Sequence, residues 1–95
     1  MELRYTNNFF RDLKRYGYDK EFMQLLSSKR NHIINAGSIN EINGLVLIRD
    51  TDVHYRFKIK ISGKLVYRIG IRLLKDTVWL ACLDNNKKRF YKRFP

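Results

Sequence analysis

Basic and apolar residues alternate along residues 55–61, in a pattern that brings several cations together. Arg56, Lys58 and Lys60 stand between apolar neighbours at every second position. Successive side chains of a β-strand point to opposite faces, so the segment predicts a strand with one apolar face and one row of cations. The cations of such a row repel one another, and a bound polyanion relieves this repulsion. The pattern therefore indicates a surface directed at RNA or DNA.

The following strand is predicted to add a cation to this row. Residues 62–64 predict a turn and residues 65–72 a second strand. With a three-residue loop Lys58 lies opposite Arg68, whereas a two-residue loop would place it across from Tyr67 and mix the two faces. Like charges directly opposite each other cost roughly 0.2–1 kcal/mol. We therefore expect the longer loop, and an anion site at the paired cations.

The positive charge is concentrated in the second half of the chain. The formal net charge is +11, and residues 53–95 account for +10 of it. Between Val53 and Lys75 there are seven Lys and Arg residues and no acidic residue. A balance this basic fits nucleic acid, an anionic membrane surface or an acidic protein. The alternation along residues 55–61 favours nucleic acid among these partners.

Length and composition predict a single domain spanning residues 1–95. The chain is 44% hydrophobic and has no Gly/Ser-rich linker and no repeat, which is typical of one small folded unit. Its single cysteine, Cys82, excludes an internal disulfide, and we expect Cys82 and Trp79 in the core. The chain opens on polar residues and holds no run long enough to span a membrane, so a cytoplasmic location is expected.

The first half predicts a short strand and two helices. Residues 1–6 predict the strand, and Thr6 and Asp19 are suitable N-caps for helices that end near Gly17 and Gly37. The apolar residues at helical spacing are Phe9, Phe10, Leu13, Tyr16, Phe22, Leu25, Leu26 and Ile33. The resulting hairpin must cover an apolar surface.

The second half predicts strands. Residues 78–83 are apolar without alternation, which is typical of a central strand covered on both faces. Residues 90–94 are expected to add a last strand or a docked tail. The order is β-α-α-β-β-β, an α+β fold in which both helices pack on one side of a twisted antiparallel sheet.

Several segments resemble the RelE/ParE superfamily of bacterial type II toxins. They are YRFKI at residues 55–59, VYRIGI at 66–71, TVWL at 77–80 and KKRFYKRFP at 87–95. The helical hairpin with Phe10 fits the same family, so the resemblance covers the whole chain. It implies a RelE-like fold.

The resemblance also implies a function. Members similar to this chain are small ribosome-associated endoribonucleases that cut mRNA without a metal or other cofactor. The chain would then be the toxin of a type II toxin–antitoxin system, an mRNA interferase that inhibits translation. The implied partners are a cognate acidic antitoxin, mRNA and the ribosome, with no membrane and no small-molecule cofactor.

Site residues follow from the resemblance by position. The catalytic residues it implies are Arg56, Lys58, Arg68, Lys87 and Tyr91. The further nucleic-acid contacts that we expect are Lys60, Lys64, Arg89, Lys92 and Arg93. Lys87 stands where related chains often have Arg, and no histidine precedes it, although many relatives have a His-Arg pair here.

Metal-free RNA cleavage uses the ribose 2′-OH as nucleophile, and it needs a base, cations for the growing negative charge and an acid for the leaving oxygen. Lysine serves as the base if neighbouring cations lower its pKa, which makes Lys58, between Arg56 and Lys60, the best-placed candidate. The fork of Arg68 suits phosphate stabilisation. Tyr91 suits stacking on a base or orienting the 2′-OH.

Two other functions remain open. A second branch of the superfamily poisons DNA gyrase by protein contact, without catalysis. A plain RNA-binding or ribosomal module with the same basic sheet is the other alternative. Retention of Arg56, Lys58, Arg68 and Tyr91 together favours the ribonuclease.

Overall fold

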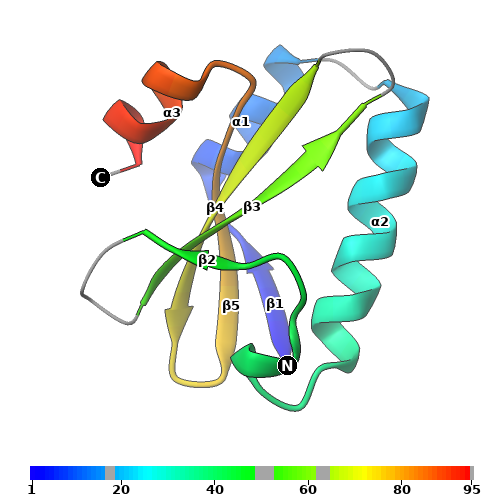
Figure 1. The fold of residues 1–95 in the computed structure, drawn as a ribbon, viewed down its shortest axis with the longest axis vertical. Helices are drawn as coiled ribbons and strands as arrows, with labels where there is room; N and C mark the ends of the chain where they lie inside the picture. The colour runs from blue at the N-terminus through cyan, green and yellow to red at the C-terminus, as the bar shows by residue number, and fades with distance from the viewer. Residues whose placement is uncertain (17–18, 49–52, 62–64, 95) are drawn as a thin grey trace.

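The computed structural model describes residues 1–16, 19–48, 53–61 and 65–94 (Figure 1). The elements in chain order are β1 (Glu2–Tyr5), α1 (Asn7–Arg15), α2 (Lys20–Asn35), η1 (Ile39–Glu41), β2 (Val46–Leu47), β3 (His54–Lys60), β4 (Val66–Leu74), β5 (Thr77–Asp84) and α3 (Lys87–Arg93). The expected β-α-α-β-β-β order is present, and η1, β2 and α3 are added to it. Among the described residues, no helix has both the length and the apolar character needed to cross a membrane.

The five strands form one mixed sheet in the order β1-β5-β4-β3-β2. Three of the pairings are antiparallel, and β1 pairs with β5 in parallel. The expectation of a wholly antiparallel sheet is therefore wrong at one edge. The reason is that β1 leads into a helix, not a hairpin, so nothing forces it to run against its neighbour. The interior position expected for residues 77–83 is confirmed.

The predicted register between β3 and β4 is confirmed. Lys58 lies opposite Arg68, and the Ile61 amide donates to the Leu65 carbonyl at 2.9 Å. The loop at residues 62–64 lies outside the described residues. Lys58 is exposed, whereas its neighbour Ile59 is buried, as the alternation predicted. The strand thus has one apolar and one basic face.

Both predicted N-caps are present. The Thr6 hydroxyl accepts from the Phe9 amide at 3.1 Å, and an Asp19 carboxylate oxygen accepts from the Phe22 amide at 2.8 Å. These contacts satisfy amides that the first turn of a helix otherwise leaves unpaired. They fix where α1 and α2 begin.

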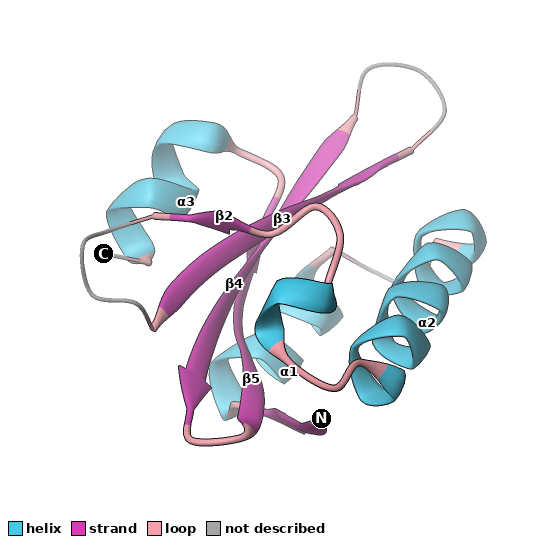
Figure 2. Cartoon of the chain, turned by 60° about the horizontal axis from the view of Figure 1, so that its bottom comes forward, coloured by secondary structure: helices cyan, strands magenta, loops and turns pink. Residues whose placement is uncertain are grey.

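The helices lie on both faces of the sheet (Figure 2), with α1 and α2 on one face and α3 on the other. The core under α1 and α2 includes Phe9, Phe22, Leu26, Ile33, Phe57, Ile59, Tyr67, Ile69, Ile71, Val78, Leu80 and Leu83. Phe10 and Leu25, expected on the apolar stripes, remain largely exposed. The apolar faces of the two helices are therefore narrower than the spacing suggested.

The C-terminal segment is a helix that docks on the sheet, so the expected last strand is wrong and the alternative of a docked tail is confirmed. The Asn86 side chain caps α3 by accepting from the Arg89 amide at 2.9 Å. Phe90 and Phe94 are four residues apart, which is the helical spacing, and both are buried against the sheet beside Cys82. Residues 90 and 94 would lie on the same face of a strand as well, so their spacing alone does not distinguish the two structures. The N-cap at Asn86 is specific to the helix.

Gly70 is where the sheet accommodates α3. A Cβ atom at this position would lie 2.6 Å from Cδ2 of Phe94, closer than side-chain contacts allow. The Phe94 ring therefore rests directly on the backbone of β4. Cys82 beneath α3 is buried as expected, and burial raises the pKa of its thiol to about 11. Trp79 is only partly buried, so its expected core position is wrong in part.

Candidate functional site

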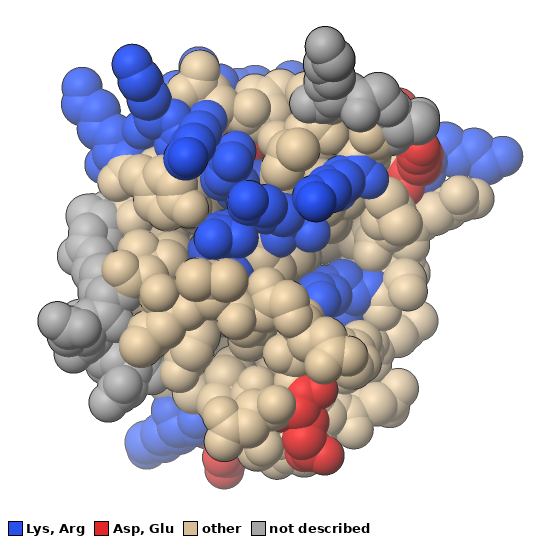
Figure 3. Space-filling view, in the orientation of Figure 1, with Lys and Arg blue, Asp and Glu red and all other residues tan. Residues whose placement is uncertain are grey.

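Cations from β3 and β4 gather on the face of the sheet that also carries α3. Arg56 and Lys58 come from β3, and Arg68 of β4 lies directly opposite Lys58. Figure 3 shows Lys and Arg side chains clustered over the upper half of this view, with acidic side chains mainly at its right side and in its lower part. We call Arg56, Lys58 and Arg68 the basic face.

The basic face lowers the pKa of the Lys58 amine below its ordinary value. The Arg56 guanidinium is the largest cause, loss of water around the amine comes next, and Arg68 contributes after that. Each neighbouring cation makes a further positive charge costly. Tyr91 of α3 acts on the same amine in the opposite sense, so its phenol lies within electrostatic reach.

The two arginines of the basic face have buried donors without partners. Among the described residues, the Nε–H groups of Arg56 and Arg68 are shielded from solvent and donate to no hydrogen-bond partner. An unsatisfied buried donor costs about 1–3 kcal/mol. A phosphate provides acceptor oxygens for such donors. The arrangement therefore suits an anion that inserts between these side chains.

Two of the candidate catalytic residues lie on one side of α3. Lys87 is the first residue of α3, and Tyr91 follows one turn later on the same side of the helix. Tyr91 is 37% exposed, and its ring stands edge-on to Phe90 with 5.1 Å between centroids. The structure thus brings Tyr91 near Lys58. Lys87 lies on the same side of α3 as Tyr91, but no contact joins it to the basic face among the described residues. Lys60 ends β3, Lys92 is exposed on α3, and Lys64 lies outside the described residues.

Arg89 and Arg93 make ion pairs within the chain. Arg89 Nε lies 2.8 Å from Asp84 Oδ2, and Arg93 contacts the same oxygen through Nη1 at 2.9 Å. Arg93 Nη2 also lies 2.6 Å from Asp12 Oδ1. These contacts give both arginines a structural role in attaching α3. Their expected contacts with nucleic acid stay a prediction.

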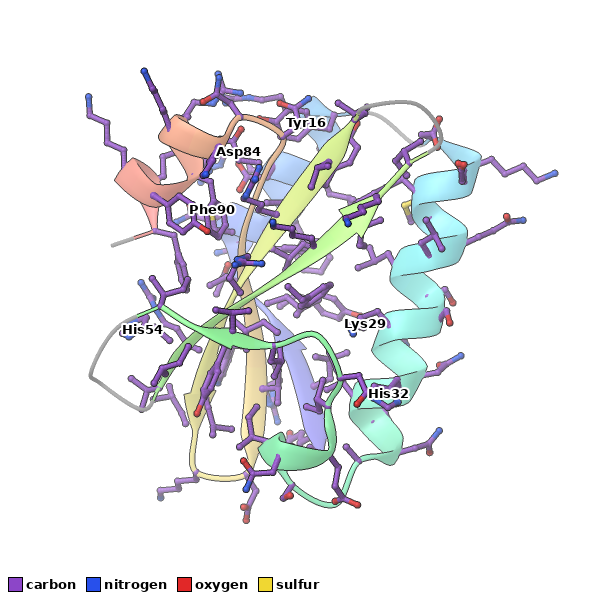
Figure 4. The ribbon with its side chains drawn as sticks, in the orientation of Figure 1. Tyr16, Lys29, His32, His54, Asp84 and Phe90 are labelled. Carbon is purple, nitrogen blue, oxygen red and sulfur yellow. The ribbon has the colours of Figure 1, made fainter. Side chains whose placement is uncertain are left out.

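Asp84 is the centre of this attachment. Its side chain is fully buried, and Oδ1 accepts from the Tyr16 hydroxyl at 2.8 Å and from the Asn86 amide at 2.9 Å (Figure 4). Burial alone raises the pKa of this carboxyl. Hydrogen bonds from Arg89, the Asn86 amide, Tyr16 and Arg93 outweigh burial and hold the pKa below its ordinary value. One carboxylate thus joins α1, β5 and α3.

Sequence reasoning missed this network, although a signal for it was present. Asp12 lies three residues after Phe9, on the buried side of α1, and is 4% exposed. Its Oδ2 accepts from the Leu83 amide at 3.0 Å. An acidic residue on an apolar helix face has to find a partner in the interior. That position, together with the basic residues of the C-terminal segment, was a signal from which an ion pair could have been predicted.

The arrangement of the elements is that of a RelE-like α+β protein, which confirms the fold expected from the sequence. The structure is similar to a chain of the RelB–RelE antitoxin–toxin complex from Methanococcus jannaschii. The TM-score is 0.68 and the sequence identity 23%, and the match covers 96% of this chain and 98% of that chain. No protein-family model and no curated protein matches the sequence. At this identity the likeness establishes the fold.

Replacing Asp84 with Asn should loosen α3. The substitution leaves Arg89 and Arg93 without their shared counter-charge. We expect the free energy of unfolding to fall by about 3 kcal/mol, which is the lower end of the range for removing one partner of a buried ion pair. The lower end applies because both guanidiniums are partly exposed. Asp76→Asn removes the same charge from an exposed turn and is the matched control. Chemical denaturation measures the difference. Labelling of Cys82 beneath α3 should be faster by about tenfold or more in D84N.

The same pair of variants predicts a pH dependence. The folded-state pKa of Asp84 is lower than its unfolded value, so its stabilisation is complete above about pH 4 and is lost as the pH falls towards the folded pKa. The stability gap between wild type and D84N should be constant from about pH 5 to 7 and narrow below about pH 4. If D76N differed from wild type in stability by as much as D84N does, over the same pH range, the central role of Asp84 would be contradicted.

Proposed function

We propose that this chain is the toxin of a toxin–antitoxin pair and that it cleaves mRNA on the ribosome. The observation that carries the proposal is the basic face. There, Lys58 lies opposite Arg68 and next to Arg56, and the two arginines have buried Nε donors that no described residue pairs with. Uncompensated like charges held this close are suited to a phosphodiester. The RelE-like fold and the antitoxin complex of its structural neighbour support the toxin role.

In the proposed reaction, Lys58 acts as the general base. Its neutral amine takes the proton of the ribose 2′-OH, and the 2′ oxygen attacks the adjacent phosphorus. The bond from phosphorus to the 5′ oxygen breaks, which leaves a 2′,3′-cyclic phosphate and a 5′-hydroxyl end. Arg56 and Arg68 stabilise the negative charge on the non-bridging oxygens.

The remaining roles fall to α3. Tyr91, half exposed beside the basic face, stacks on a base or orients the 2′-OH. The leaving 5′ oxygen takes up a proton, for which Lys87 is the proposed donor. Lysine and tyrosine are weak acid–base groups at neutral pH, so most of the rate enhancement has to come from positioning, which the ribosome supplies by holding the mRNA.

Substitutions in the basic face test the mechanism. Lys58→Ala and Arg68→Ala should each lower mRNA cleavage by about 100-fold or more, because each removes a contact made in the transition state. Both variants should keep or slightly raise the melting temperature, since each removes one of two repelling cations. Lys88→Ala, an exposed position on α3, is the control with the same charge change. Primer extension on translated mRNA measures cleavage, and thermal melting measures folding.

The outcomes separate the candidate functions. Equal cleavage by wild type and K58A removes Lys58 from the mechanism. Growth arrest without mRNA cleavage by the wild type favours a gyrase poison. Absence of both favours a binding module without catalysis.

A pH profile tests whether Lys58 acts as a neutral amine. The cleavage rate should rise with pH and level off below the ordinary lysine value of about 10.4, because Arg56 and Arg68 lower the pKa of Lys58. Arg56→Gln removes the largest cause, so the pKa rises and the plateau moves to higher pH. Lys14→Gln, at an exposed position on α1, which packs on the opposite face of the sheet, is the control. An unchanged profile in R56Q would contradict the role of Lys58 as base.

The proposed partner is an acidic antitoxin that orders on binding and covers the basic face or displaces α3. Co-expression with the product of an adjacent reading frame should relieve growth arrest and yield a complex. The charge complementarity predicts that the complex weakens as salt concentration rises. A pair that forms no complex and leaves growth arrested would refute this partner.

A further inference from the structure

A cleft of about 420 Å³ opens between α2 and β3, next to the basic face. Its lining residues are Leu25, Ser28, Lys29, His32, Asn43, Lys58, Ile59 and Lys60. The short strand β2 pairs only with Tyr55 and Arg56, so within the described chain the second half of β3 has no strand neighbour on this side. The cleft takes the place of that neighbour.

The far wall of the cleft is already ordered without a ligand. Lys29 Nζ donates to the Asn43 carbonyl and lies 5.4 Å from the centre of the Phe57 ring. His32 Nε2 accepts from the Asn43 amide at 3.2 Å. Figure 4 shows Lys29 and His32 extending from α2 towards the sheet. Two helix side chains thus hold the backbone of Asn43, which lines the cleft.

The chemistry of the lining suits a nucleotide. Leu25, which is 40% exposed, offers apolar surface for a base, and Lys29 and Lys60 offer ammonium groups for a phosphate. A lysine ammonium has three donors, so Lys29 retains donors beyond the one that it gives to Asn43. The volume lies within the roughly 300–1,000 Å³ typical of small-ligand sites.

We propose that this cleft binds a nucleotide of the same single-stranded RNA whose scissile phosphate lies on the basic face. The inference rests on the proposed function and adds a second subsite to it. Lys58 belongs to both places, since it lines the cleft and faces Arg68. A single-stranded RNA that passes over Lys58 therefore enters the cleft and remains in contact with cationic side chains. The cleft then sets which phosphate reaches Lys58.

An acidic protein segment is the competing occupant. Such a segment would bind the same ammonium groups. It would make no use of the apolar surface of Leu25 unless it also carried an apolar side chain. A nucleotide uses both through one unit, because its base is flat and apolar on its faces while its phosphate is charged. The continuity with the basic face through Lys58 also favours RNA.

Two neighbouring serines provide a matched test. Ser28 lines the cleft, whereas Ser27 lines a different groove between α1 and α2, and both are exposed. Ser28→Glu places a negative charge in the cleft, and Ser27→Glu changes the net charge equally on the other side of α2. The probe is a fluorescent single-stranded RNA of about ten nucleotides with 2′-O-methyl riboses, which cannot be cleaved. Anisotropy then measures binding independently of cleavage.

We expect S28E to weaken RNA binding about fivefold or more and S27E less than about twofold. The slope of log affinity against log salt should be shallower by about 0.7 in S28E, as for one lost contact with a single-strand phosphate. Asn43→Asp, an isosteric change at the cleft, should act as S28E does. It provides a second readout should S28E melt at a lower temperature.

Equal binding by S28E, N43D and S27E overturns the cleft as an RNA subsite, while wild-type cleavage of mRNA leaves the proposed function in place. Wild-type protein that neither binds nor cleaves RNA overturns both. If S28E and N43D weaken only the complex with an acidic antitoxin, the cleft is a protein-binding site and the inference is wrong.

Discussion

The buried carboxylate of Asp84 is the interaction on which the working surface depends. It ends the interior strand β5 and receives hydrogen bonds from Tyr16 at the end of α1 and from Arg89 and Arg93 of α3. A carboxylate without solvent is stable only when such donors surround it. The requirement of this one group for partners therefore holds α3 across the sheet. Because α3 is held there, Tyr91 lies beside the basic face.

The packing beneath α3 reinforces the same arrangement. The Phe94 ring rests on Gly70, where a side chain would clash with it, and the Arg72 guanidinium lies 5.5 Å from the ring centre on the exposed side. Apolar packing resists sliding of the helix, while the ion pairs fix its direction. Two different interactions thus position one short helix, which is too short to be stable alone.

The cations of this chain divide into two groups by how their charge is compensated. Arg89 and Arg93 are neutralised inside the molecule by Asp84 and Asp12. The cations of the basic face have no such carboxylates in the sequence around them, since residues 53–75 contain none. Their mutual repulsion lowers the pKa of Lys58, and within the described part of the chain the Nε donors of Arg56 and Arg68 have no partner. The first group builds the structure, and the second is available to a polyanion.

The sequence by itself determined the basic face, because strand alternation and loop parity are local rules that fix which side chains share a face. It also determined where α1 and α2 begin, since a cap needs only a residue and its next turn. Only the tertiary structure decided that β1 runs parallel to β5, that residues 87–93 form a helix, that Asp84 collects both arginines and that a cleft lies beside Lys58. Each of these depends on groups far apart in the chain, and no local spacing reports which distant partners a buried charge or an open strand edge will meet.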